Sequence, residues 1–223
     1  FIVSLVVIGL FCAIIYYLCI IYTYMILENY YYFLINCIPP RICDEIVQFG
    51  SSLQEEFATT GQITEAEAQE KQEEIKIHRD SNVSWMSEPW IYNEIHPRIH
   101  EANRNAGWNF EWDYTEPAQF TKYKLNQYYH WHEDQDVKPF NNGEPAYQGK
   151  IRKLSCTLQL SHPDEYEGGD LEFETPNGIF KVDEIKPRGS ICVFPSFVKH
   201  RVTPVTKGVR HSLVMWNLGY PYK

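Results

Sequence analysis

The chain has 223 residues and a net charge of −9; 44% of its residues are hydrophobic and 22% are charged. This composition suits a globular protein with one sizeable core and excludes extensive disorder. The negative charge disfavours nucleic acid or an anionic membrane surface as the main partner, because both attract basic proteins. The 16 tyrosines and 6 tryptophans favour strands over a purely helical bundle.

The N-terminal segment, residues 1–27, contains no charged residue. An apolar run of more than about 18 residues predicts a transmembrane helix. The run exceeds the apolar core of a secretory signal, and no small-residue cleavage site follows it. We therefore expect a membrane anchor here. The alternative is an over-extended reading frame, since the sequence begins with Phe1.

Amphipathic helices are predicted at residues 41–58 and 88–106, because apolar side chains recur there every three or four positions. Pro97 lies within the second segment, where it is a candidate kink. Residues 59–76, which are acidic and rich in Gln, are predicted to form an exposed loop or a solvated helix. The apolar faces consist of Ile42, Ile46 and Phe49 in the first helix, and of Trp90, Ile91, Ile95, Ile99 and Ala102 in the second.

From Trp108 onward the apolar residues alternate with a period of two. Short aromatic and β-branched runs are separated by Gly, Pro and Asn turns, for example at 141–143 and 187–189. Many short strands at this density indicate a β-sandwich or barrel. The expected fold class is therefore α+β and mainly β, with the helices first and a strand-rich C-terminal half after them.

The six cysteines form no CxxC pair, which argues against a zinc knuckle and against a disulfide framework. Cys156 and Cys192 fall in strand-like runs, where a free cysteine behaves as a small buried hydrophobic residue. We expect the main domain to reside in a reducing compartment such as the cytoplasm.

A candidate metal site lies in the segment from Tyr123 to Asp134. In a strand, His132 and Asp134 share one face, so they can present an imidazole and a carboxylate to the same cation. His200, at the end of another apolar run, is the candidate third ligand. Two His and one carboxylate leave coordination positions open and are typical of non-haem Fe(II) oxygenases. A surface His-x-Asp pair is the alternative, and His130 competes with His132 because the two share a face.

Arg210 follows His200 by ten residues, across the predicted turn 206–208. A hairpin there would return the chain beside the His200 strand and bring Arg210 into the same cavity. A buried guanidinium requires an anion, and the distal carboxylate of 2-oxoglutarate fits, with the Ser212 hydroxyl as a second donor. The alternative is a surface arginine on an edge strand. One face of this strand is expected to carry Arg210, Ser212, Val214 and Trp216.

These residues occur within an ordered set of motifs. Residues 123–134, YKLNQYYHWHED, resemble the Y-x-x-G-x-x-Y-x-x-H-x-D segment of the prolyl 4-hydroxylase-like branch of the 2-oxoglutarate/Fe(II) dioxygenases, which includes the PKHD-type hydroxylases. Residues 166–173 resemble the family's E-G-G-x-L hairpin, and residues 194–210 its distal His/Arg block. Asn126 replaces the usual Gly, and Asn tolerates a left-handed turn better than most residues. The resemblance extends from about residue 38 to 219.

The resemblance implies a double-stranded β-helix (jelly roll) with supporting N-terminal helices, in a domain spanning 28–223 with its core at about 108–219. It implies Fe(II), 2-oxoglutarate as cosubstrate, and L-ascorbate as a candidate further cofactor. The implied reaction hydroxylates an unactivated C–H bond, with a prolyl or other amino-acid residue as the leading substrate, and releases succinate and CO₂. Residue by residue, it implies His132, Asp134 and His200 as iron ligands, and Arg210, Tyr123, Ser212 and Trp216 as cosubstrate-binding residues.

The expected partners are O₂ and a peptide or small-molecule substrate. Residues 135–150 and about 59–88 are predicted to surround the pocket entrance, or else to be plain solvent loops. Two other functions stay open from sequence. A zinc hydrolase can also use two His and one Asp, although it has no need of Arg210. A non-catalytic jelly-roll binding module would not need all three ligands.

Overall fold

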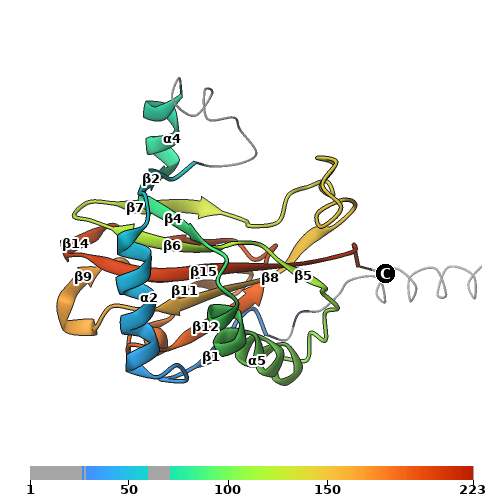
Figure 1. Ribbon diagram of the computed structural model, residues 1–223, viewed down its shortest axis with the longest axis horizontal. Helices are drawn as coiled ribbons and strands as arrows, with labels where there is room; N and C mark the ends of the chain where they lie inside the picture. Colours follow the sequence, from blue (N-terminus) through green and yellow to red (C-terminus); the bar gives the residue numbers. More distant parts are fainter. Residues whose placement is uncertain (1–26, 28, 60–70, 223) are drawn as a thin grey trace, which may run out of the picture.

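The structure, a computed structural model, describes residue 27, residues 29–59 and residues 71–222. The framework of this part is formed by two antiparallel sheets (Figure 1). The larger sheet has the order β1 (Tyr32–Leu34), β12 (Ile191–Pro195), β8 (Ile151–Gln159), β15 (Arg210–Gly219), β6 (Ala118–Tyr123), β4 (Asn82–Met86) and β2 (Glu56–Phe57), with β5 (Tyr114–Thr115) paired to β15.

The smaller sheet supplies two of the candidate ligands. Its order is β11 (Gly178–Lys181), β10 (Leu171–Thr175), β13 (His200–Val202), β7 (Tyr128–His132) and β3 (Arg79–Asp80). A separate two-stranded pair consists of β14 (Val205–Gly208) and β9 (Tyr166–Gly168). The helices are α2 (Pro40–Ser52), α4 (Gln72–His78) and α5 (Pro89–Asn105), with 3-10 turns at Pro163–Glu165 and Asp183–Ile185.

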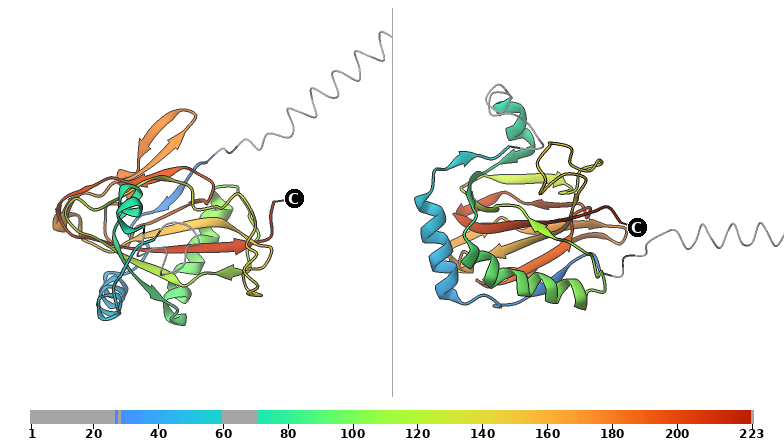
Figure 2. Two further views of the ribbon diagram at one scale, coloured as in Figure 1. Left: turned by 90° about the horizontal axis from the view of Figure 1, so that it is seen from above. Right: turned by 45° about the vertical axis from the view of Figure 1, so that its right-hand side comes forward.

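Helices α2 and α5 cover the outer face of the larger sheet (Figures 1 and 2). Their predicted apolar faces pack into one core cluster with Leu213 and Met215 of β15, with Phe49 and Trp90 only partly buried at its edge. Burial of each such side chain contributes about 1.5–3 kcal/mol, so this layer fixes the sheet against the helices. The alternate residues of β15 face the other way, into the space between the two sheets, as the period of two predicts.

The first predicted helix is too long at its C-terminal end. α2 ends at Ser52, and Leu53 is extended; Glu56 and Phe57 then form β2 against β4. The polar run after Ser52 is compatible with a helix by propensity, but pairing with the β4 edge decides its conformation. The second predicted helix is confirmed as α5, which continues through Pro97. Within the predicted loop or solvated helix, residues 60–70 lie outside the described part, and α4 begins at Gln72.

The predicted order, helices first and strands after them, is incomplete. Strands β1 to β4 all precede Trp108; β1, β2 and β4 belong to the larger sheet, and β3 belongs to the smaller one. These strands have two to five residues, too few to show a period. Their conformation comes from pairing with distant strands, for example β4 with β6.

The predicted membrane anchor over residues 1–27 lies, apart from its last residue, outside the described part of the chain. Within that part, none of the helices has the length and apolar composition needed to cross a membrane. Cys156 and Cys192 are buried free thiols, as predicted, and Cys37 and Cys43 are free as well.

Candidate metal centre and adjoining anion pocket

The two candidate histidine ligands lie on neighbouring strands of the smaller sheet. His132 ends β7 and His200 begins β13, and the antiparallel register places them opposite each other. Asp134 follows β7 by two residues, and its backbone N–H donates to the Ser196 carbonyl at 2.9 Å. One ligand atom from each of the three side chains lies within 4.8 Å of the others. A single cation can therefore contact all three.

Each histidine ring is held by a backbone carbonyl. His132 Nδ1 is 2.7 Å from the His130 carbonyl, and His200 Nδ1 is 2.9 Å from that of Val198. Because a carbonyl can only accept, Nδ1 donates in each ring, and in a neutral ring the lone pair is then on Nε2. Both Nε2 atoms lie 3.6 Å from the Asp134 carboxylate, one facing each oxygen. Two imidazole nitrogens and one carboxylate, oriented in this way, fit an Fe(II) ion.

The Asp134 carboxylate is oriented from behind by a buried hydroxyl. Ser155 Oγ, on β8 of the larger sheet, donates to Asp134 Oδ2 at 2.7 Å and lies 2.9 Å from Ser196 Oγ. Asp134 Oδ1 is left facing His132. Ser155 of the larger sheet thus orients Asp134, which follows β7 of the smaller sheet. The hydrogen bond between them links the two sheets at the site.

The charges of His132 and Asp134 also suit a cation. Burial, reinforced by the nearby His200, lowers the pKa of His132 to about 3. Burial by itself would raise the pKa of Asp134, but His200, His132, Arg152 and the Ser155 hydroxyl together lower it to about 2. At neutral pH His132 is therefore neutral and Asp134 is ionised, and these are the forms that bind a metal.

His130 is not part of the site. The register of β7 against β13 shifts between the pairs His132↔His200 and Tyr129↔Val202, so β7 accommodates one extra residue there. This irregularity brings Tyr129 to the face of His132, where the two rings stack with centroids 3.4 Å apart. His130 is exposed, and its Nδ1 accepts from the Trp131 backbone N–H.

Arg210 is buried, with 3% of its surface exposed, so it is not a surface arginine. Its Nε donates to Gln159 Oε1 at 3.1 Å, and its guanidinium lies 5.7 Å from the centre of the Tyr123 ring. In the described part of the chain no carboxylate lies within ion-pair distance of Arg210. A buried cation without a counter-charge is costly, so this site fits an anionic ligand such as a 2-oxoglutarate carboxylate.

The route by which Arg210 reaches the site differs from the predicted hairpin. Residues 205–208 form β14, which pairs with β9 instead of turning beside β13. The chain then enters β15 in the larger sheet, between β6 and β8. Arg210 therefore faces His200 from the opposite sheet. The ten-residue spacing between the two residues did not reveal that the chain passes from one sheet to the other.

One cavity between the sheets, here named the inner cavity, is lined by all the site residues predicted from sequence. Burial raises the pKa of Tyr123, although Arg79 and Arg210 partly offset the effect, so the phenol stays protonated and can donate a hydrogen bond. Ser212 is fully buried beside it. The predicted residues that line the inner cavity are His132, Asp134, His200, Arg210, Tyr123, Ser212 and Trp216.

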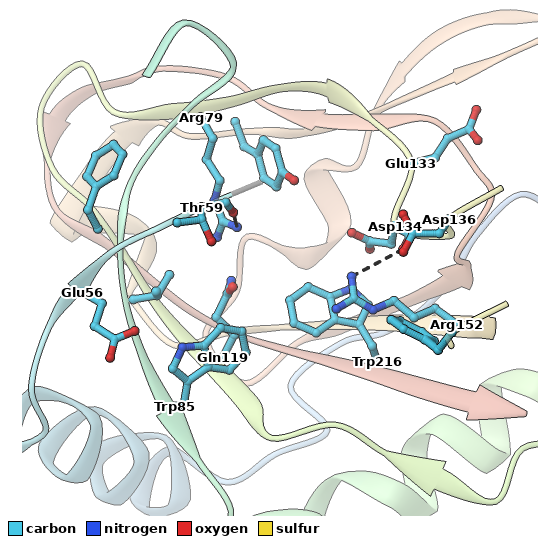
Figure 3. A pocket seen from close by; sticks show the side chains of 14 residues that line it. Glu56, Thr59, Arg79, Trp85, Gln119, Glu133, Asp134, Asp136, Arg152 and Trp216 are labelled. Carbon is cyan, nitrogen blue, oxygen red and sulfur yellow. Dashed lines mark hydrogen bonds between the residues drawn. The ribbon is translucent and has the colours of Figure 1, made fainter. Parts of the chain in front are cut away.

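A second, larger pocket adjoins the inner cavity and is here named the outer pocket (Figure 3). Figure 3 shows Arg79 and Thr59 on one side of it, and Asp134, Asp136 and Arg152 on the other. The loops predicted to surround the entrance do line it, through Thr59, Trp85, Asp136 and Phe140 among others. The residues that line both spaces are Arg79, Gln119, Tyr129, Asp134 and Trp216.

The pair Arg152–Glu116 was missed by sequence reasoning. Arg152 Nε and Nη2 donate to the two Glu116 oxygens at 2.7 and 2.6 Å. The guanidinium also lies 4.1 Å from the centre of the Trp216 ring, and its Nη1 is 3.4 Å from the Asp134 carbonyl. The pair joins positions 36 residues apart, so only the fold could reveal it. It fixes Trp216 beside the candidate ligand Asp134.

Tyr129 and Arg79 were also missed. Tyr129 is visible in sequence as a tyrosine beside the His-x-Asp pair, but the register shift that brings it against His132 is not. Arg79 lies in β3, whose two residues pair with Tyr129 and Tyr128 of β7. Arg79 was not predicted as a site residue, and only 4% of its surface is exposed.

Comparison with known proteins agrees with this geometry. Residues 118–217 match the model of the 2OG-Fe(II) oxygenase superfamily. The chain is 37% identical over 103 residues to a PKHD-type hydroxylase of Xylella fastidiosa (strain M23), covering 46% of this chain and 44% of that protein. It is 52% identical over 64 residues to a PKHD-type hydroxylase of Hyphomonas neptunium, covering 28% and 27% of the two chains. The matches thus span less than half the length of these relatives.

Solved structures share the fold. The viral collagen prolyl hydroxylase of Paramecium bursaria Chlorella virus-1, in its 2OG complex, superposes with a TM-score of 0.59 and 19% identity, covering 86% of this chain and 97% of that one. The Trichoplax adhaerens prolyl hydroxylase, in complex with a hypoxia inducible factor peptide fragment, gives a TM-score of 0.59 and 16% identity over 85% and 84% of the chains. At such identities the likeness concerns the fold alone.

Proposed function

We propose that this chain is a 2-oxoglutarate- and Fe(II)-dependent dioxygenase that hydroxylates an unactivated C–H bond, since residues 118–217 match the model of the 2OG-Fe(II) oxygenase superfamily. One observation carries the proposal. Two histidines and one carboxylate that can hold a cation share a cavity with a buried arginine, which has no carboxylate within ion-pair distance among the described residues. A zinc hydrolase or a binding module would need the first feature at most, whereas a 2-oxoglutarate enzyme needs both.

In this proposal His132, Asp134 and His200 hold Fe(II). The two imidazoles and the ionised Asp134 carboxylate would hold the ion and leave positions open for 2-oxoglutarate and O₂. Bound Fe(II) and 2-oxoglutarate would supply the oxidising power, so that substrate, O₂ and 2-oxoglutarate give hydroxylated substrate, succinate and CO₂. The protein contributes the geometry of the ligands and a cavity that limits access of water.

Arg210 is proposed to bind the distal carboxylate of 2-oxoglutarate. Its planar guanidinium can form two charge-assisted hydrogen bonds with a carboxylate. The Tyr123 phenol and the Ser212 hydroxyl lie on the same lining and are proposed as further donors. Trp216, packed under the Arg152 guanidinium, would form the wall between the cosubstrate and the outer pocket.

The proposed domain spans residues 28–223, with a double-stranded β-helix core at about 108–219 to which β1–β4 add strands. The outer pocket would admit the substrate. A prolyl or other amino-acid residue in a peptide is the proposed target, since the Trichoplax structural neighbour holds a peptide fragment. L-ascorbate is included as an accessory reductant that would return oxidised iron to Fe(II).

The proposal is tested by succinate formation from 2-oxoglutarate in air, with and without Fe(II), followed by a prolyl-peptide turnover screen. Succinate should require Fe(II) and 2-oxoglutarate together, and His200→Ala should reduce it to background. Full activity with zinc alone, or succinate formation that His200→Ala leaves unchanged, would falsify the proposal.

A further inference from the structure

A second arginine lies buried at the site, and the proposed chemistry does not use it. Arg79 is 4% exposed and lines both the inner cavity and the outer pocket. Strand β3 places it beside β7, where the backbone of Arg79 pairs with that of Tyr129. Its guanidinium lies 4.5 Å from the centre of the Tyr129 ring, and that ring stacks on His132. Only the Tyr129 ring therefore lies between the Arg79 guanidinium and the candidate ligand His132.

The partners of Arg79 are all neutral. Nε donates to Ser81 Oγ at 3.0 Å, and Nη1 makes a long contact of 3.4 Å with the Thr59 carbonyl. Within residues 27, 29–59 and 71–222, no carboxylate lies within ion-pair distance of it. The half-buried arginines of the same part are each paired with a carboxylate: Arg98 with Glu101, Arg152 with Glu116, Arg188 with Asp44, and Arg201 with Glu172.

Arg79 and Arg210 are thus two buried guanidinium groups in adjoining spaces, and neither has a carboxylate within ion-pair distance among the described residues. A buried charge of this kind is costly unless an anion pairs with it. 2-Oxoglutarate has two carboxylates. Under the proposed function one lies at the metal and the other at Arg210, so the cosubstrate leaves Arg79 without a partner.

We propose that Arg79 binds a carboxylate of the substrate that is oxidised, at the junction of the inner cavity and the outer pocket. This inference rests on the proposed function and specifies its substrate class. The carboxylate can be a terminal one, as in a free amino acid or a chain end, or an acidic side chain next to the target residue. The three carboxylates at the mouth of the pocket, Glu56, Glu133 and Asp136, are exposed, so solvent screens their repulsion of an anion.

The test measures binding of matched probes by calorimetry to protein loaded with Mn(II) and 2-oxoglutarate, which binds without turnover. N-acetyl-proline and N-acetyl-prolinamide differ only in a terminal carboxylate. Acetyl-Pro-Asp-amide and acetyl-Pro-Asn-amide differ only in a side-chain carboxylate. In at least one pair the carboxylate should bind about tenfold more tightly or better, as expected of a charge-assisted bond in a buried site.

Arg79→Gln should abolish this preference for the carboxylate. Arg79→Lys should retain part of it, because lysine keeps the positive charge but cannot form the two parallel hydrogen bonds of a guanidinium. Arg201→Gln is the matched control. Arg201 also lies on the smaller sheet, with its guanidinium 4.6 Å from the Trp131 ring centre, but it is already paired with Glu172 and lines neither space. It should keep the wild-type preference.

Two results overturn the inference. The first is the absence of any carboxylate preference in the wild-type protein, whether both members of each pair bind equally or neither binds. The second is a preference that survives in Arg79→Gln. Failure of the proposed function is recognised separately, because Mn(II)-dependent binding of 2-oxoglutarate would then be missing in the wild-type protein. If the inference holds, Arg79→Gln binds 2-oxoglutarate within about twofold of wild type, which also shows that the cavity is intact.

Discussion

Ser155 illustrates how individual residues prepare the candidate metal centre. Its hydroxyl is completely buried and bridges Asp134 Oδ2 and Ser196 Oγ. Such a hydrogen bond holds a ligand carboxylate in one orientation before a metal binds, and it lowers the pKa of that carboxylate. The backbone carbonyls behind His132 and His200 act on the two rings in the same way.

Ser155→Ala should weaken binding of Mn(II) or Fe(II) by about 10- to 100-fold, because Asp134 loses its orienting donor. Ser84→Ala is the control: it removes a buried hydroxyl that donates to the Gly50 carbonyl at 3.1 Å, on β4 and away from the ligands. Metal titration by calorimetry under anaerobic conditions measures both variants. Equal metal affinity in Ser155→Ala and wild type would mean that the hydroxyl has only a packing role.

A second prediction at this scale separates the two neighbouring histidines. His132→Ala should lower metal affinity by more than about 100-fold, since a direct ligand is lost, whereas His130→Ala should change it less than about twofold because His130 is exposed. The same titration applies. Comparable losses in the two variants would show that β7 presents its residues differently from the register found here.

At the scale of elements, what the sequence predicts depends on how local the cause is. The α5 helix and the alternation along β15 follow from periodic burial, and both are found. Asn126 adopts a φ of 66°, as expected for an Asn in the place of a turn Gly. The end of α2 and strands β1–β4 depend on pairing with distant strands, which local patterns do not contain. The register shift in β7, which excludes His130, is equally invisible in sequence.

The turn at 187–189 was predicted from its Pro and Gly, and it gives a test at this scale. Gly189 has a φ of +79°, and a Cβ there would lie 2.1 Å from the Ile38 carbonyl, so the turn closely contacts the segment before α2. Gly189→Ala should destabilise the protein by about 2–4 kcal/mol, through left-handed strain and this clash, and lower the midpoint of thermal unfolding by several degrees.

Gly107→Ala is the matched control for this prediction. Gly107 has a similar φ of +77°, but no atom lies within 4 Å of the added Cβ. It should show the backbone strain alone, about 1 kcal/mol. Thermal and denaturant unfolding of both variants measure the loss in free energy of unfolding. Equal losses in Gly189→Ala and Gly107→Ala would mean that the contact with Ile38 does not contribute.

At the scale of the whole molecule, the site depends on the two sheets facing each other. His132 and His200 come from the smaller sheet, whereas Arg210, Tyr123, Ser212 and Trp216 come from the larger one. The sequence identified these side chains through motif spacing and resemblance. It could not predict Arg79 or the Arg152–Glu116 pair, because their burial is a consequence of how the sheets close over the cavity.

The most direct test of the central claim is a calorimetric titration of 2-oxoglutarate into the protein with and without Fe(II), under anaerobic conditions. If one cavity holds the metal and the cosubstrate through separate groups, 2-oxoglutarate will bind tightly only when Fe(II) is present. Arg210→Gln will then weaken 2-oxoglutarate by about tenfold or more and leave Fe(II) affinity unchanged. Binding of 2-oxoglutarate that depends on neither Fe(II) nor Arg210 would contradict the claim.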